Sequence, residues 1–159
     1  MEVWIPYLQS ASRPRPAATI ANTSKVTGSI KSKGLKAIND QIEPSNSKDG
    51  TVPYFHWWPK KNTTEWVQYD FDKQHPVSSS QVYWFDDSPW GGCRIPAAWK
   101  IYYKSNNGLW LPVNNTSSYE IAKDKYNTVE FEPIVTAALK LEVQLPVDNA
   151  TGIHEWIVK

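Results

Sequence analysis

Short runs in which apolar and polar residues alternate recur along most of this chain. The clearest run covers residues 139–145, where leucine or valine occupies every second position and Lys, Glu and Gln lie between them. A second run covers 65–71, with valine, tyrosine and phenylalanine on one face. A period of two is typical of a β-strand that buries one face.

Other strand candidates follow from β-branched and aromatic clusters bounded by Pro, Gly, Asn and Ser, and they lie at 19–24, 77–86, 99–104, 109–111, 127–131 and 153–158. Asn106-Asn107-Gly108 is a turn signal between two of them. Only 35–40 is expected to form a helical turn. About eight strands without a long helix predict an all-β fold, a two-sheet antiparallel β-sandwich of the jelly-roll kind.

The length of 159 residues is suited to one folded domain. The Pro-rich start, 1–16, is interpreted as a linker that follows a preceding domain, and 17–159 as the sandwich. The start has neither the charged nor the apolar region of a signal peptide, so a secretion signal is expected upstream in a longer parent. No run approaches the roughly 18 apolar residues of a membrane span, and membrane insertion is not expected.

The charge is balanced, with 17 basic and 16 acidic residues, which argues against a nucleic-acid partner. The aromatic residues are unusual: 9 Trp and 8 Tyr against 4 Phe. Indole and phenol rings suit surfaces that are partly apolar and partly wet, such as the faces of sugars. About two thirds of the tryptophans are expected in the core. A single cysteine allows no intrachain disulfide and favours a bacterial source.

Five segments, in this order along the chain, resemble landmarks of the discoidin-like (coagulation factor 5/8 type C) domains: 35–40, 64–71, 82–84 with 94–96 and 99–103, 139–143, and 152–156. The resemblance covers 17–159. One departure is Gln41, which stands where the family usually has glycine. The resemblance implies a galactose-binding-domain-like fold, similar to carbohydrate-binding module family 32.

A narrower resemblance links 53–59, and 84–87 with 91–96, to modules that close bacterial glycosidases, such as the β-L-arabinofuranosidase-like enzymes of gut Bacteroides. Residues 3–6 are similar to the end of such a catalytic domain. This implies a module that holds a parent glycoside hydrolase on glycan, in a secreted, periplasmic or outer-surface protein of a Gram-negative bacterium. The alternative is a structural domain that packs on the catalytic domain and has no ligand of its own.

The resemblance also implies a sugar site made by a histidine, an arginine, an acid and an exposed aromatic at one end of the sandwich. The loops around 56–58 and 86–94 carry such a set. We predict that the contacts are made by His56 and Arg94 as donors, Asp87 as acceptor, Trp90 as stacking platform and Trp58 beside them, with Glu43 and Asn149 as further loop candidates.

Purely structural roles for the same residues remain open. Trp57, Trp58 or both are equally explained as plugs of the core. Arg94 is equally explained as a brace of its own loop, paired with Asp86 or Asp87.

The resemblance also implies a structural Ca²⁺, which discoidin-like sugar modules often hold, and the carboxylates that match its ligands are Asp40 and Glu155. Ser45 and backbone carbonyls near Ala37 and Ile42 would complete the oxygen-rich set that Ca²⁺ prefers. The alternative is that Asp40 caps a turn and Glu155 is a solvated or ion-paired strand residue. Zinc is not expected, because the histidines lack ligand spacing.

No catalytic constellation is evident. Adjacent carboxylates, such as those of Asp86 and Asp87, point to opposite faces of a strand and cannot flank one glycosidic bond unless the loop bends sharply. A nucleophile elbow and a histidine partner for Cys93 are not found in the sequence. We therefore expect a binding module and not an enzyme.

Overall fold

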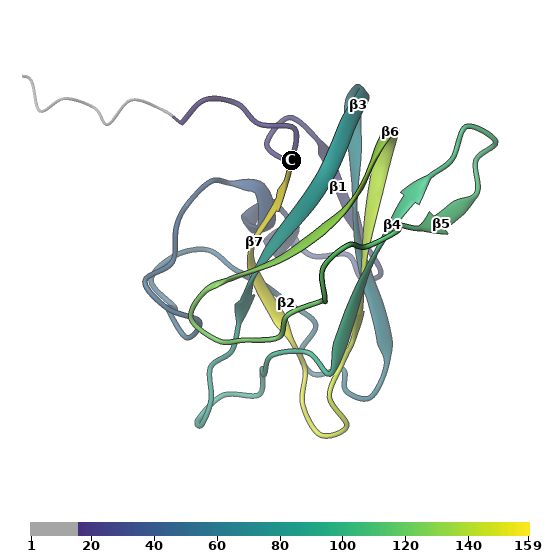
Figure 1. Cartoon of the computed structure of the whole chain (residues 1–159). Helices are drawn as coiled ribbons and strands as arrows, with labels where there is room; N and C mark the ends of the chain where they lie inside the picture. The colour runs from purple at the N-terminus through teal and green to yellow at the C-terminus, as the bar shows by residue number, and fades with distance from the viewer. Residues whose placement is uncertain (1–15) are drawn as a thin grey trace, which may run out of the picture.

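The computed structural model describes residues 16–159, so the predicted linker lies outside the described residues, apart from Pro16. The elements in chain order are β1 (Lys25–Gly28), the 3-10 helix η1 (Lys33–Asn39), β2 (Phe55–His56), β3 (Thr64–Phe85), β4 (Ala98–Lys104), β5 (Trp110–Pro112), β6 (Tyr126–Gln144) and β7 (Gly152–Val158) (Figure 1). The predicted all-β class is confirmed. Within 16–159 no helix has the length and apolarity needed to cross a bilayer.

The strands form one continuous seven-stranded sheet in the order β2-β7-β3-β6-β4-β5, with β1 paired to β3. The long strands β3 and β6 run antiparallel from the Thr64–Gln144 pair to the Tyr83–Tyr126 pair, with irregular register after Asp70 and after Val77. The first part of β3 also pairs with β1, and the last part pairs with β7. The sheet therefore folds over itself into the two layers of a sandwich, with the irregular stretch between them.

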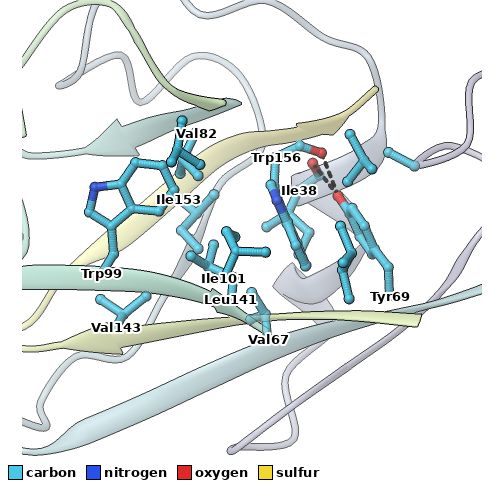
Figure 2. Close-up of a cluster of buried hydrophobic side chains, with 14 of the residues drawn as sticks. Ile38, Val67, Tyr69, Val82, Trp99, Ile101, Leu141, Val143, Ile153 and Trp156 are labelled. Carbon is cyan, nitrogen blue, oxygen red and sulfur yellow. Dashed lines mark hydrogen bonds between the residues drawn. The ribbon is translucent and has the colours of Figure 1, made fainter. Parts of the chain in front are cut away.

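The core lies between these layers. Tyr69 from β3 stacks on Trp156 from β7, with ring centroids 4.0 Å apart. The hydroxyl of Tyr69 shares its single proton between the carbonyls of Ile38 (3.0 Å) and Trp156 (2.7 Å), as Figure 2 shows. A buried phenol is stable because its polar end is paired in this way. The contact also joins η1 to both layers.

The strand predicted at 19–24 is wrong, because this segment forms turns and the first strand begins at Lys25. The amide of Thr23 donates to the carbonyl of Thr19, and the amide of Asn22 donates to the Thr19 hydroxyl. Short hydroxyl side chains offer the backbone such local partners in place of a sheet ladder.

The remaining predicted strands are present, but two pairs of them are joined into longer strands. The runs at 65–71 and 77–86 are two parts of β3, and those at 127–131 and 139–145 are two parts of β6. The predicted helical turn is η1, and the turn at 106–108 connects β4 to β5. A bend within a strand leaves the alternation of apolar and polar residues intact on either side. The sequence pattern therefore predicts two strands where the structure has one.

The tryptophans divide between core and surface. Four of the eight in 16–159 are buried: Trp57, Trp84, Trp99 and Trp156. Trp58 is 59% exposed and Trp90 is 94% exposed. An exposed indole leaves a large apolar area in water, so these two residues mark a surface that is available to a ligand.

Candidate functional site

Three loops meet at the end of the sandwich that lies at the bottom of Figure 1: 57–63, 86–97 and 145–151. Backbone hydrogen bonds join them. The amide of Asn62 donates to the carbonyl of Pro146 (2.8 Å), and the amide of Ala150 donates to the carbonyl of Gly92 (3.0 Å). The loops 57–63 and 86–97, together with Tyr54 and the ends of β2 and β3, border a pocket of about 210 Å³, lined by Tyr54, His56, Trp58, Phe85, Asp87, Gly92 and Cys93.

The floor of this pocket is aromatic. Tyr54 stacks on Phe85 with ring centroids 3.7 Å apart and an interplanar angle of 8°. Phe85 is the last residue of β3 and is buried, whereas Tyr54 is half-buried and faces the pocket. A flat, partly wet ring on a rigid support is suited to the apolar face of a sugar.

His56 ends β2, and its pairing with Gly152 of β7 fixes its backbone at the edge of the sheet. Its ring lines the pocket and lies 5.9 Å from the ring of Tyr54. Its Nδ1 atom is buried and has no hydrogen-bond partner in the described part of the chain. A buried polar atom without a partner is costly, so a ligand hydroxyl or an ordered water is the natural partner for this atom.

The neighbouring tryptophans have opposite roles. Trp57 is fully buried, and its indole N–H donates to the hydroxyl of Ser29 (3.1 Å). Trp58 points outward and borders the pocket. A Cβ atom at Gly92 would lie only 2.5 Å from Cδ1 of Trp58, so the indole rests against the bare backbone of that glycine.

Asp87 lines the pocket and also closes the 87–93 turn. One carboxylate oxygen accepts the amide of Cys93 (2.8 Å), and the backbone carbonyl accepts the amide of Gly91 (2.9 Å). A Cβ atom at Gly91 would lie 1.7 Å from Oδ2 of Asp87, so the turn requires glycine there. Oδ2 makes no hydrogen bond within 16–159, which leaves it able to accept one from a ligand.

Arg94 is committed to this loop and is not among the residues that line the pocket. One guanidinium nitrogen donates to the carbonyls of Gly91 (2.6 Å) and Cys93 (2.8 Å), and it lies 3.8 Å from the carboxylate of Asp87. These are the contacts of a brace. The role of Arg94 as a donor to the ligand stays a prediction.

Asp86 faces away from the pocket. Its two oxygens accept the amides of Ser88 (3.0 Å) and Ile95 (2.8 Å), and Lys123 lies 3.7 Å away. Burial acts to raise the pKa of this carboxyl, but the hydrogen bonds and the nearby ammonium outweigh burial, so the pKa is lowered. Asp86 therefore holds the two ends of the loop as a buried carboxylate.

Trp90 occupies the tip of the same loop, where it is almost fully exposed and borders none of the described pockets. The structure thus brings His56, Trp58 and Asp87 together around one pocket and leaves Trp90 beyond its rim. The stacking role of Trp90 stays a prediction.

The predicted calcium ligands are only partly gathered. Asp40 contacts Glu155, and Glu155 is buried with Oε1 lacking a partner in 16–159. Burial, the contact with Asp40 and the charge of Glu43 raise the pKa of Glu155 to about 10. Ser45 instead belongs to an exposed turn in which its amide donates to Asp49 (2.9 Å).

This pair of carboxyl groups fits a cation, which would give Oε1 of Glu155 the partner that it lacks within residues 16–159. No larger cluster surrounds the pair: the described residues contain no group of three or more His, Cys, Asp or Glu placed to hold a metal.

Gln41 has φ 62°, a left-handed conformation in which glycine is favoured. The loop shape associated with glycine is therefore kept by this residue.

Cys93 is the remaining reactive side chain at the pocket. Burial and the nearby carboxylates of Asp87 and Asp86 raise the pKa of its thiol to about 12. The thiol is therefore protonated at neutral pH and is not a nucleophile in this state.

Sequence reasoning missed Tyr54, Phe85 and Gly92. Tyr54 stands two residues before His56, a spacing that puts both side chains on one face of an extended chain, and this signal was available. Phe85 and Gly92 are contributed by other segments, and only the packing of the loops brings them to the pocket.

A search against protein-family models found no match. Solved structures are similar to the chain in fold. A structure of the Streptococcus pneumoniae β-galactosidase has a TM-score of 0.71 at 17% identity, covering 85% of this chain and 90% of that one. A family 32 module from Clostridium perfringens, in complex with GalNAc-β-1,3-galactose, has a TM-score of 0.66 at 11% identity, covering 89% and 99%.

The chain has the discoidin-like fold of the family 32 carbohydrate-binding modules. A candidate α-L-fucosidase from Bacteroides thetaiotaomicron contains the same fold as one part of a longer chain, with a TM-score of 0.64 at 11% identity, covering 91% of this chain and 29% of that one. At these identities the likeness concerns the fold alone.

Proposed function

We propose that this domain is a non-catalytic carbohydrate-binding module that holds a terminal sugar in the pocket between Tyr54, Trp58 and Asp87. The observation that carries the proposal is the pocket itself. It combines an aromatic floor, an exposed indole, the ring of His56, whose Nδ1 has no partner among residues 16–159, and the carboxylate of Asp87. Sugars are recognised by rings against their C–H faces and by a few oriented polar groups.

The roles follow from position. Tyr54 and Trp58 supply apolar contact, His56 hydrogen-bonds a hydroxyl, and Asp87 accepts a hydroxyl proton. Arg94 keeps the Asp87 turn in shape, and Trp90 extends from the rim toward the rest of a glycan. Galactose-containing ligands are the first to test, because a structure with this fold holds GalNAc-β-1,3-galactose.

The wider proposal is that the module serves a parent glycoside hydrolase in a secreted, periplasmic or outer-surface protein of a Gram-negative bacterium. Support comes from the occurrence of this fold within longer glycosidase chains. One shallow pocket binds weakly, so such a module would act by raising the local concentration of glycan around the tethered enzyme.

We also propose that a Ca²⁺ ion binds between Asp40 and Glu155. The orphaned Oε1 of Glu155 and its contact with a second carboxylate support this site. Hard oxygen ligands suit Ca²⁺. In this role the cation is structural and lies apart from the sugar pocket.

The alternative is a structural domain that packs on its catalytic partner and binds no sugar. The exposed area of Trp58 and Trp90 would then be covered in the parent protein. The two functions differ in what the isolated domain does with glycans.

The proposal is tested by NMR titration of the domain with galactose and with GalNAc-β-1,3-galactose, supported by a glycan array. We expect dissociation constants in the micromolar to millimolar range and loss of binding in Trp58→Ala and His56→Ala. Trp110→Ala is the matched control, because Trp110 is an indole on β5 and does not line the pocket. A well-folded domain that binds nothing across the array would favour the structural alternative.

A further inference from the structure

A second pocket adjoins the first across Trp58. It measures about 240 Å³ and is lined by Trp58, Pro59, Lys61, Gly92, Asp148, Asn149 and Ala150. Trp58 and Gly92 border both pockets, whose volumes are similar. The indole therefore forms part of a wall that the two pockets share, and its exposed area is available from both.

The polar side chains of this second pocket are free. Lys61, Asp148 and Asn149 make no side-chain hydrogen bond or ion pair within residues 16–159. Asp86 and Arg94 of the 86–97 loop, by contrast, are bound to protein groups. Three polar side chains that converge on one pocket without partners are available to a ligand.

The backbone beneath these side chains is held in place. The amide of Arg94 donates to the carbonyl of Ala150 (2.8 Å), and the amide of Trp57 donates to the carbonyl of Thr151 (3.1 Å). The residue before this anchored pair is Asn149, which is half-buried. A ligand that hydrogen-bonds the side-chain amide of Asn149 would not have to order the loop first, which lowers the entropic cost of binding.

The chemistry of the pocket indicates which ligand it suits. Lys61 donates, Asp148 accepts and the amide of Asn149 does both. The positive and negative charges offset each other, so the pocket offers no net charge to select an acidic sugar. Trp58 and Pro59 add apolar surface for a ring face.

We propose that this pocket is a subsite for a second, neutral sugar, so that the module recognises a disaccharide or a longer glycan that straddles Trp58. The inference rests on the proposed function, because the first sugar must occupy the pocket of His56 and Asp87. Specificity for the linkage then comes from the geometry across the shared indole.

The test compares two probes, galactose and GalNAc-β-1,3-galactose, by calorimetric or NMR titration. We expect the disaccharide to bind the wild type at least about tenfold more tightly than galactose. In the variant Lys61→Ala/Asp148→Ala/Asn149→Ala the affinity for the disaccharide should fall to that for galactose, and the affinity for galactose should not change. Lys104→Ala, an exposed lysine on β4, is the matched control for the loss of a charge.

The outcomes separate the two proposals. If both probes bind with equal affinity, or if the triple variant retains the preference for the disaccharide, the subsite is refuted and the sugar pocket stands. If neither probe binds the folded wild type, the galactoside-binding function fails and the subsite fails with it. His56→Ala should weaken both probes, which the triple variant does not do.

Discussion

At the scale of single residues, the site depends on one close approach. The bare backbone of Gly92 is what allows the indole of Trp58 to stand where both loop pockets use it. Trp58 is exposed and contributes little to the core, so its position matters more for a ligand than for stability. This separation makes Gly92 an informative position to change.

The substitution Gly92→Ala should weaken sugar binding at least about tenfold, equivalent to about 1.4 kcal/mol. The added Cβ would lie 2.5 Å from Trp58 Cδ1, so the indole must move. Because the ring is at the surface, the free energy of unfolding should fall by less than about 1 kcal/mol. Titration with galactose and chemical denaturation measure the two effects.

Gly50→Ala is the control for this experiment, since a Cβ at Gly50 meets nothing within 4 Å. Unchanged affinity in Gly92→Ala would mean that the position of Trp58 does not determine binding, and would move the aromatic contact to Trp90.

At the scale of elements, the 86–97 loop carries charged side chains of the kinds that bind ligands, but most of them hold the loop itself in shape. Asp86 closes the loop through two amides, and Arg94 closes it through two carbonyls. A loop with no regular structure keeps one shape only when its backbone groups find such partners. These contacts give the pocket a rigid wall, and Asp87 is the residue of this wall whose carboxylate lines the pocket.

Acid should loosen this loop. The pKa of Asp86 is lowered in the folded protein, so its contribution to stability is complete above the ordinary value of 3.8 and is lost as the pH falls below it. Asp86→Asn replaces one acceptor oxygen with a donor and should lower the free energy of unfolding by about 1 to 3 kcal/mol at pH 7.

Denaturation of both proteins between pH 3 and pH 7 measures this effect, with the exposed Glu132→Gln as control. The difference between wild type and Asp86→Asn should shrink toward pH 3. A difference that stays constant across this range would show that the charge of Asp86 does not hold the loop.

At the scale of the whole molecule, β7 connects the two proposed sites. Gly152 at its start pairs with His56 of the sugar pocket, and Glu155 farther along contacts Asp40. Glu155 also lines a separate pocket of about 320 Å³ together with Pro16 and Lys159. Figure 1 shows the end of β7 beside the first described residues, at the opposite end of the sandwich from the loops 57–63, 86–97 and 145–151. The proposed cation site and the proposed sugar pocket therefore lie at different ends of one fold.

Calcium should stabilise the folded domain. After treatment with a chelator, added Ca²⁺ should raise the melting temperature, and a concentration 100 times the dissociation constant corresponds to about 2.7 kcal/mol. Asp40→Asn and Glu155→Gln should each abolish this response. Thermal denaturation with Mg²⁺ as the comparison ion measures it. The same melting temperature with chelator and with millimolar Ca²⁺ would refute the site and leave the two carboxyl groups sharing a proton.

Much of the fold could be predicted from local pattern. The alternation at 139–145 placed four side chains in the core, and all four are buried, because the period of a strand is a property of the backbone. The turn at 19–24 could not be predicted in the same way. Its threonines favour a strand by propensity, and their hydroxyl hydrogen bonds decided otherwise.

The candidate site could be predicted only in part. The types of side chain, and the two loops that carry His56, Trp58 and Asp87, are evident from the residues alone. The choice between Trp57 and Trp58 as core plug was not, because the two residues follow the end of β2, where no alternation says which side chain points inward. The third loop, 145–151, was seen only as a weak candidate, since its neighbours in space are about 50 to 90 residues away along the chain.

The sequence by itself therefore determined the all-β class, the positions of most strands and the chemical character of the loops, because these depend on local periodicity and on residue type. Only the tertiary structure decided that Arg94 braces its loop, that Gly92 supports Trp58 and that Glu155 lies against Asp40. The Arg94 contacts are local and depend on the shape that the 86–97 loop takes. The other two contacts join segments that are distant in sequence, and packing of the whole core brings those segments together.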